Sequence, residues 1–348
     1  MHITFFVGNG FDISCGIHSS YSDFYKWYCT QEKSEKTHIN AFRGKIESDI
    51  NAGKENWADF EEALGKYTEN FTKDNVHEFI ECFEDAHSKL MEYLETEMAR
   101  FKFDFSGETV KSLRDGIMSF YAELSPRERN QFEGIFKSCR NESTTIDFVS
   151  YNYTDTLDRI LSVAAKEPLD TWSNANGQRC TLTISKTITH AHGLLDHCPI
   201  FGVNDEKQIA NKALLEVPDF SRLMIKPKCV KALGELWHDE IGARISNSTI
   251  ICIYGMSMGI TDSVWFEKIM DWLKESDNRQ LVVFWYTKHP SNGRSIWQVL
   301  ANTREARKRL IDYSDYSAQQ AESIGERIHV IENTKHVLRL RLEEIDRR

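Results

Sequence analysis

Short apolar runs recur along the chain and predict buried β-strands. They cover residues 3–7, 146–151, 250–254, 281–286 and 328–331. Runs without polar alternation are typical of a parallel sheet that is covered on both faces. Apolar residues at helical spacing follow two of the runs, at Leu157, Ile160, Leu161 and Ala164 and at Phe266, Ile269, Met270 and Leu273. This alternation of strands and helices predicts an α/β fold with a Rossmann-like parallel sheet.

The segment between the first two predicted strands has a different pattern. Residues 22–140 carry almost no strand signal, and apolar residues at helical spacing predict one long amphipathic helix over 76–98. Ser125 and Glu128 have capping-box spacing, and Pro126 stands at the first helical position. The pattern therefore predicts a second helix that begins there.

These patterns divide the chain into a core and an insertion. We expect residues 1–21 and 141–348 to form the Rossmann-like core. We expect residues 22–140 to form a helical cap over the carboxyl edge of the sheet, with a role in regulation or oligomer contacts. Within the core, residues 169–189 predict a strand or hairpin around the Asn-Ala-Asn-Gly turn at 174–177.

Net charge, apolar stretches and cysteine spacing exclude some classes of protein. The 348 residues carry a formal net charge of −10, which argues against general nucleic-acid binding. The start of the chain has no basic leader, and no apolar stretch approaches the ~20 residues that span a bilayer. The eight cysteines include no C-x-x-C pair, and we interpret them as reduced thiols. We therefore expect a soluble, cytoplasmic protein without membrane contact.

A metal site is the weaker interpretation of one short segment. His190, His192 and His197 lie close together in the sequence, beside Cys198. Two ligand clusters at characteristic spacing would indicate zinc, but no second cluster is apparent. We therefore expect no metal.

A glycine turn follows the first predicted strand. Gly8, Asn9 and Gly10 stand where backbone amides and the absence of side chains allow close approach to a phosphate. The full dinucleotide fingerprint is absent, because Ile13 occupies the place of its third glycine. A tight strand-exit turn and a phosphate cradle are about equally compatible with this motif.

Two further motifs follow later strands. Asn152 stands at the carboxyl end of the second apolar run, where α/β sheets bind ligands, and its amide both donates and accepts hydrogen bonds. The alternative is that Asn152 or Thr154 caps the next helix, and for Thr154 capping is the favoured interpretation. His192 precedes Gly193 after the predicted hairpin, which suits proton transfer beside a sharp turn.

The glycine loop after the third apolar run admits three interpretations. Gly255, Ser257 and Asp262 lie in a loop between the third apolar run and a predicted helix. The segment 255–259 also matches the G-x-S-x-G pattern of serine hydrolases, although only His289, His329 and His336 follow it. A hydrolase therefore ranks below a nucleotide site. A simple helix cap at Thr261 or Asp262 is the structural alternative.

Together these motifs resemble the AbiH family of phage abortive-infection proteins. The segments that carry the resemblance are FFVGNGFD at 5–12, GI at 16–17, SYSDF at 20–24, WADFE at 57–61, YNYTDTL at 151–157, HAHG at 190–193, FGVND at 201–205 and YGMSMGITD at 254–262. The ordered set is specific, although each segment is short. Residues beyond about 275 add little to it.

The family in turn resembles a divergent sirtuin-type fold. The resemblance implies that Asn152 and His192 are catalytic, and that the substrate NAD is bound at Gly8, Asn9, Gly10, Asp12, Gly255, Ser257 and Asp262. It further implies cleavage of NAD to nicotinamide and ADP-ribose, with no cofactor required. Three positions depart from the sirtuin pattern. Thr154 stands where an acidic residue follows the asparagine, Asp12 replaces a serine after the glycine turn, and Asn9 replaces a small residue inside that turn. The zinc-binding cysteine pairs of deacylating sirtuins are also absent.

The leading hypothesis is an anti-phage defence enzyme that hydrolyses NAD. The alternative from another class is a non-catalytic sensor that binds NAD or a related nucleotide and acts through a partner. A homo-oligomer and a phage-derived trigger or defence partner remain open. Both hypotheses require the candidate residues to converge, because the ends of parallel strands share one edge of the sheet. We therefore expect them to line a single cleft.

Overall fold

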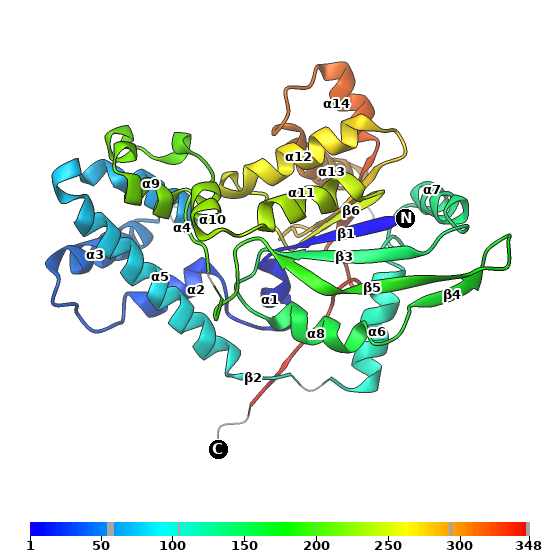
Figure 1. The fold of residues 1–348 in the computed structure, drawn as a ribbon, viewed down its shortest axis with the longest axis horizontal. Coiled ribbons are helices and arrows are strands. Elements are labelled where there is room, and N and C mark those ends of the chain that lie inside the picture. Colours follow the sequence, from blue (N-terminus) through cyan, green and yellow to red (C-terminus); the bar gives the residue numbers. More distant parts are fainter. Residues whose placement is uncertain (54–58, 104, 198, 292–294, 346–348) are drawn as a thin grey trace.

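A seven-stranded sheet forms the centre of the molecule (Figure 1). The computed structural model describes residues 1–53, 59–103, 105–197, 199–291 and 295–345. The strand order is β4-β5-β3-β1-β6-β7-β8, and among the described strands of this sheet only β4 and β5 pair antiparallel. The strands are β1 (His2–Val7), β3 (Thr144–Ser150), β4 (Asp170–Ser173), β5 (Arg179–His190), β6 (Ile250–Tyr254), β7 (Gln280–Trp285) and β8 (Ile328–Glu332).

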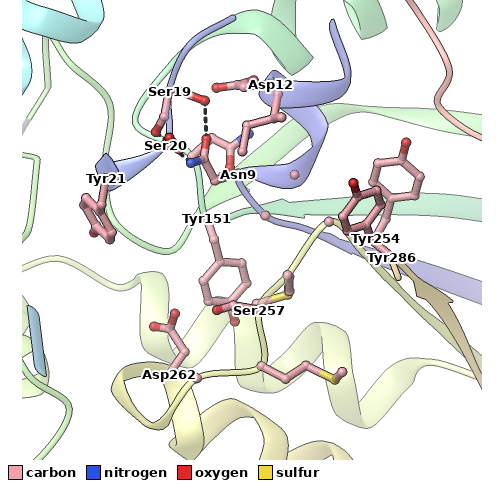
Figure 2. Close-up of a pocket in the computed structure, with 18 of the residues that line it drawn as sticks. Asn9, Asp12, Ser19, Ser20, Tyr21, Tyr151, Tyr254, Ser257, Asp262 and Tyr286 are labelled. Atoms are coloured by element: carbon pink, nitrogen blue, oxygen red, sulfur yellow. Dashed lines mark hydrogen bonds between the residues drawn. The ribbon is translucent and has the colours of Figure 1, made fainter. Parts of the chain in front are cut away.

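The chain winds outward from β1 in two directions. It passes from β1 to β3 and β5 on one side, then returns to β6 beside β1 and continues to β7 and β8. This is the doubly wound order of the Rossmann fold, so the predicted fold class is confirmed. Ligands of such sheets bind outside the carboxyl strand ends where the order reverses, which is here between β1 and β6. Figure 2 shows the loops that meet there.

The apolar runs and the hairpin are confirmed as strands. In β1, the adjacent side chains of Phe5 and Phe6 enter different hydrophobic clusters, because successive residues of a strand point to opposite faces. Residues 169–189 form the antiparallel pair β4 and β5. Ser150 at the end of β3 is in register with His190 at the end of β5, so both strands stop at the same edge of the sheet.

Helices cover both faces of the sheet (Figure 1). One face packs against α11 (Trp237–Asn247), α12 (Ser263–Glu275), α13 (Ile296–Ile311) and α14 (Ala318–Gly325). The other face packs against α6 (Gly107–Met118), α7 (Pro126–Ser138) and α8 (Thr156–Ala164). Ser125 and Glu128 make the predicted capping box at the start of α7.

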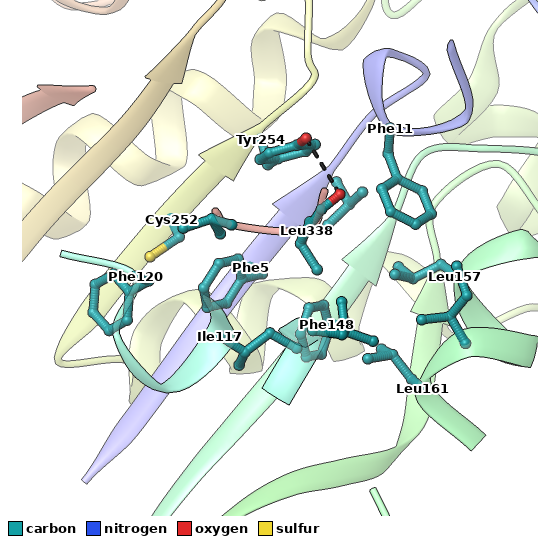
Figure 3. Close-up of a cluster of buried hydrophobic side chains, with 14 of the residues drawn as sticks. Phe5, Phe11, Ile117, Phe120, Phe148, Leu157, Leu161, Cys252, Tyr254 and Leu338 are labelled. Carbon is teal, nitrogen blue, oxygen red and sulfur yellow. Dashed lines mark hydrogen bonds between the residues drawn. The ribbon is translucent and has the colours of Figure 1, made fainter. Parts of the chain in front are cut away.

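Aromatic side chains fill the core beneath α6 and α7 (Figure 3). The ring of Phe5 stacks on that of Phe148 at a centroid distance of 5.2 Å and meets Phe120 edge-on at 5.8 Å. Ile117 and Leu338 lie in the same fully buried cluster. Residues far apart in sequence therefore hold the central strands and the second helical layer together.

A third hydrophobic cluster lies beyond the carboxyl edge of the sheet. It contains α2 (Tyr21–Tyr28), α3 (Thr37–Asn51), α4 (Phe60–Tyr67) and α5 (Val76–Met98), together with residues 200–225, which include α9 (Pro218–Met224). We call the described parts of residues 21–98 and 200–225 the helical lobe. It appears beside the sheet in Figure 1, at the end where β1 and β3 finish.

The hydrophobic clusters divide the predicted insertion into two parts. Residues 21–98 belong to the helical lobe, whereas α6 and α7 pack on the sheet and belong to the core. Residues 200–225 also pack in the helical lobe, although the sequence pattern assigned them to the core. The long helix predicted over 76–98 is confirmed as α5. Within the described residues, no helix combines the length and apolarity needed to cross a membrane.

Candidate functional site

A cleft of about 1350 Å³ opens at the carboxyl edge of the sheet. It is lined from loops that follow β1, β3, β5, β6 and β7, as expected where parallel strands end together. The structure brings all nine sequence-predicted site residues to its wall: Gly8, Asn9, Gly10, Asp12, Asn152, His192, Gly255, Ser257 and Asp262. Their convergence is observed, and their separate roles stay predictions.

The helical lobe forms the opposite wall. Tyr21 at the start of α2, Asp59 at the N-cap of α4, and Leu90 and Leu94 of α5 all line the cleft. The lobe therefore lies over the sheet edge, where a cap was expected. Its expected role in regulation stays a prediction.

The glycine loops pack directly against each other. The amide of Gly8 donates to the carbonyl of Tyr254 at 2.9 Å, and the amide of Gly10 donates to the carbonyl of Gly255 at 2.8 Å. A side chain at Gly10 would place its Cβ 2.7 Å from the Cα of Gly255, so this contact requires glycine. In this conformation the amides of Gly8 and Gly10 are bonded within the protein, as in a tight strand-exit turn, and their role in binding a phosphate stays a prediction.

Asn9 fixes a neighbouring loop. Its side-chain amide donates to the carbonyl of Ser19 at 2.8 Å, and the hydroxyl of Ser19 donates back to Asn9 Oδ1 at 2.5 Å. Figure 2 shows these side chains beside Asp12 at one end of the cleft. Asn9 thus shapes the wall of the cleft by holding the loop that leads into the helical lobe.

Asp12 and Asn152 are buried polar side chains with unused hydrogen-bonding capacity. Asp12 is 1% exposed and Asn152 is 4% exposed. Asp12 Oδ2 accepts a hydrogen bond from the hydroxyl of Thr154 at 2.6 Å. Asp12 Oδ1 and both polar atoms of the Asn152 amide have no hydrogen-bond partner among the described residues. Because buried polar atoms are almost always paired in proteins, this arrangement indicates a ligand site.

Burial also changes the acidity of Asp12. Removal of the carboxylate from water raises its pKa from the ordinary 3.8 to about 7, although the hydrogen bond from Thr154 acts in the opposite direction. A carboxyl group with a pKa near neutrality can take up or release a proton under physiological conditions. The Asp12 side chain is therefore suited to acid–base chemistry as well as to binding.

Aromatic rings surround His192. The ring of Tyr151 meets it edge-on at a centroid distance of 5.3 Å, and that of Tyr153 lies at 5.9 Å. Burial raises the pKa of the Tyr151 hydroxyl well above its ordinary value, so the group stays protonated. That hydroxyl is buried and has no partner in the described part of the chain. It adds a hydrogen-bonding group to the cleft beside His192.

His192 belongs to a buried charge cluster. Its Nε2 atom lies 3.0 Å from Asp262 Oδ1 and 3.2 Å from Lys226 Nζ. Lys226, the first residue of α10 (Lys226–Leu233), donates to Glu61 Oε2 at 2.8 Å and to Asp262 Oδ1 at 3.1 Å. The cluster joins His192 and Asp262 at the sheet edge to Glu61 of the helical lobe.

The charges of this cluster support one another. Burial alone would lower the pKa of Lys226, but the carboxylates of Asp262 and Glu61 outweigh it and raise the pKa above its ordinary value. Burial likewise opposes ionisation of Asp262, yet Lys226 and His192 hold its pKa well below the usual range. Lys226 is therefore a fixed cation and Asp262 a fixed anion, and together they orient the imidazole ring.

The loop around Ser257 does not have the geometry of a hydrolase site. Neither His289 nor His336 lines the cleft, and His329 hydrogen-bonds to groups elsewhere. In the nucleophile elbow the serine occupies a strained turn, but the positive φ angles of this loop occur at Gly255 and Met258. The described residues therefore contain no serine–histidine pair at this position.

The histidines considered for a metal site have separate partners. His190 Nε2 lies 3.0 Å from Asp158, His192 contacts Asp262, and His197 lies 4.0 Å from Glu235. Cys198 lies outside the described residues, as do Trp57 and Ala58 of the family motifs. Across the described ranges, no group of three histidine, cysteine or carboxylate side chains is arranged so that it could hold a metal ion.

Sequence reasoning missed Lys226 and assigned no site role to Glu61. The two are 165 positions apart, and charged residues of these types usually lie on the surface. The WADFE motif at 57–61 contained Glu61, so the resemblance supplied a signal for that residue. For Lys226 the sequence offered only an isolated lysine before Pro227, which starts a helix.

The fold and the cleft define a Rossmann-like α/β protein with a candidate ligand site at the switch point of its sheet. Residues 4–285 match the family described as Bacteriophage abortive infection AbiH. The match covers most of the chain, so the protein belongs to the AbiH family, a family of phage abortive-infection defence. A search of curated proteins found no match. The sirtuin resemblance stays a prediction.

Proposed function

We propose that this protein binds NAD in the cleft and hydrolyses it to nicotinamide and ADP-ribose during phage infection. The observation that carries the proposal is the buried Asn152 amide, whose polar atoms have no partner among the described residues and which lies beside Asp12 at the switch point of the sheet. A buried amide in this position suits a ribose hydroxyl or an attacking water. Loss of NAD would halt the metabolism on which phage replication depends.

The lining of the cleft supports a substrate that carries both hydroxyl groups and phosphates. The buried side chains of Asp12 and Asn152 suit hydroxyl groups. Three exposed cations also line the cleft and suit phosphates, namely Lys288, Arg309 and Arg339. A dinucleotide presents hydroxyl groups and phosphates in one molecule, as the proposal requires.

The proposed reaction breaks the bond between the ribose C1′ and the nicotinamide nitrogen. Both electrons of that bond go to the positively charged ring, so nicotinamide leaves as a neutral molecule. Asn152 places a water on the opposite face of the ribose, and His192, which lines the same cleft, is one candidate to assist the accompanying proton transfer. The fixed charges of Lys226 and Asp262 hold the His192 ring in place during this step.

The direct test is incubation of the purified protein with NAD, with and without phage lysate, followed by chromatography of the products. We expect nicotinamide and ADP-ribose to appear in equal amounts. Asn152→Ala and His192→Ala should each lower the rate by about 100-fold or more. Asn278→Ala and His77→Ala are matched controls, because both side chains are exposed and neither lines the cleft.

Other outcomes would assign the cleft differently. Full activity of both Asn152→Ala and His192→Ala would remove these residues from the mechanism. Tight binding of NAD without cleavage, under infection conditions as well, would identify a nucleotide sensor that acts through a partner. Absence of binding and cleavage would exclude NAD as the ligand.

A further inference from the structure

The proposed hydrolysis leaves open which group accepts the proton of the attacking water. We propose that Asp12 is a further catalytic residue and that its carboxylate is this acceptor. The inference rests on the proposed NAD cleavage, because it assigns one step of that reaction. It gives Asp12 a role in bond formation, whereas the sequence motif indicated a role in binding alone.

The geometry around Asp12 leaves one carboxylate oxygen for the reaction. Oδ2 is engaged by the hydroxyl of Thr154 at 2.6 Å. Oδ1 is buried, has no hydrogen-bond partner among the described residues, and belongs to a side chain that lines the cleft. The amide of Asn152, which is proposed to orient the water, comes from the end of the adjacent strand. A water held by Asn152 would therefore meet a carboxylate oxygen without another partner.

His192 is less suited to accept this proton. Its Nε2 atom is already within 3.0 Å of Asp262 and 3.2 Å of the Lys226 ammonium group. Nε2 is thus engaged by two charged side chains, whereas Asp12 Oδ1 has no hydrogen-bond partner among the described residues. We therefore assign His192 to positioning of the ribose and Asp12 to removal of the proton.

The step conserves atoms and charge. The water oxygen forms a bond to C1′ as the bond from C1′ to the nicotinamide nitrogen breaks. The water proton passes to Asp12 Oδ1, and the second hydrogen stays on the new hydroxyl of ADP-ribose. Asp12 then releases the proton to solvent, so one NAD and one water give nicotinamide, ADP-ribose and one proton.

The surroundings of Asp12 set the pH at which it can act. Burial raises its pKa to about 7, the polar side chains of Thr154, Asn152 and Thr156 lower it, and the negative charge of Asp155 raises it. Burial, and after it the charge of Asp12, raise the pKa of the nearby Cys15 thiol, so the thiol stays neutral. A base acts when it is deprotonated, so the rate should rise with pH through about 7 and then level off.

The first experiment compares Asp12→Asn with the wild-type protein in the NAD assay over a range of pH. Asparagine keeps the size of the side chain and can still accept the hydrogen bond from Thr154. We expect kcat to fall by about 100-fold or more, KM to change by less than about threefold, and the rise in rate near pH 7 to disappear. Asp219→Asn, a change of the same kind at an exposed site, should behave as the wild type does.

Two neighbouring substitutions should move the pH midpoint in opposite directions. Thr154→Val removes a hydrogen bond to the carboxylate and should shift the midpoint to higher pH. Asp155→Asn removes a nearby negative charge and should shift it to lower pH by a smaller amount, because Asp155 is partly exposed. A purely structural role of Asp12 would not produce these paired shifts.

The possible results separate the two proposals. If the wild type cleaves NAD and Asp12→Asn does so with the same kcat and pH profile, the assignment of Asp12 is overturned and the NAD hydrolase remains. If Asp12→Asn raises KM and leaves kcat unchanged, Asp12 is a binding residue and the assignment is again overturned. If the wild type does not cleave NAD, the proposed function itself fails.

Discussion

Two buried polar sites lie at opposite ends of the strands, and their hydrogen bonding differs. At the start of β8, His329 is 1% exposed, and both of its ring nitrogens have partners at 2.9 Å, Glu128 Oε1 and Gln280 Oε1. At the end of β1, Asp12 is equally buried but uses one carboxylate oxygen only. Burial alone therefore does not distinguish a structural site from a candidate active site.

The difference lies in how completely each site is satisfied. The His329 site joins α7 to β7 and β8, with Glu128 and Gln280 as its partners. Such a site stabilises the fold, and the ring nitrogens of its histidine have no remaining hydrogen-bonding capacity for a ligand. Asp12 and Asn152 keep polar atoms unpaired within the described residues, at a free-energy cost to the fold. Functional sites are where such a cost is expected.

The two sites also have opposite effects on carboxyl acidity. The hydrogen bond from His329 holds the pKa of Glu128 down to about 2, whereas burial raises the pKa of Asp12 to about 7. Stability contributed by Glu128 is present above the pKa of the unfolded chain and is lost as pH falls. Asp12 acts in the reverse sense, since its ionised form is disfavoured in the folded state and its cost grows as pH rises.

The largest effect on stability is expected at Lys226. Lys226→Met leaves Glu61 and Asp262 buried without their cation and should lower the free energy of unfolding by about 3–5 kcal/mol. Denaturant unfolding measures this loss. The matched control Lys228→Met removes an exposed ion pair with Glu206 and should leave the free energy of unfolding nearly unchanged, because solvent screens that pair. Equal losses of unfolding free energy in Lys226→Met and Lys228→Met would contradict this prediction. They would show that the buried ion pairs stabilise the protein no more than the exposed one.

A gain in stability is expected at Asp12. Asp12→Asn removes a carboxylate that is costly to ionise, and the gain should grow as pH rises from about 4 to about 7. The free energy of unfolding of Asp12→Asn minus that of the wild type should be about 2–4 kcal/mol larger at pH 8 than at pH 3.5. Unfolding at several pH values measures it. A stability difference between Asp12→Asn and the wild type that does not grow in favour of the variant as pH rises would contradict the proposed contrast between the two sites.

The smallest effect is expected at Glu128. Glu128→Gln keeps the side-chain cap of α7, which glutamine also makes, and removes only the charge. Because Glu128 is partly exposed, the loss at pH 7 should be about 1 kcal/mol and should vanish as pH falls toward 2. The exposed Glu133 on the same helix provides the control Glu133→Gln. NAD cleavage should be unchanged in both variants.

Much of the fold could be predicted because its signals are local. The apolar run at 3–7 predicted β1, the helical periodicity predicted α5, and Ser125 with Glu128 predicted the start of α7. The division of the insertion could not be predicted, since amphipathic helices do not specify which surface they cover. α6 and α7 cover the sheet, while residues 200–225 join the helical lobe.

The candidate site was predictable in its position but not in its chemistry. Strand ends that carry glycine or Asn152 share one edge by topology, so their convergence followed from the fold. The charge cluster depends on Lys226 and Glu61, whose burial has no local signature. Asp12 and Thr154 each depart from the sirtuin pattern, and only the structure shows that they contact each other at 2.6 Å.

The helical lobe has a consequence for the order of assembly during synthesis. Its hydrophobic core needs residues 200–225 as well as residues 21–98, so a nascent chain cannot complete it until the later segment has left the ribosome. Lys226 follows directly and then reaches Glu61 and His192. A truncated translation product that ends before residue 200 would lack both the finished lobe and the cation beside His192. The wall of the cleft is therefore completed late in translation.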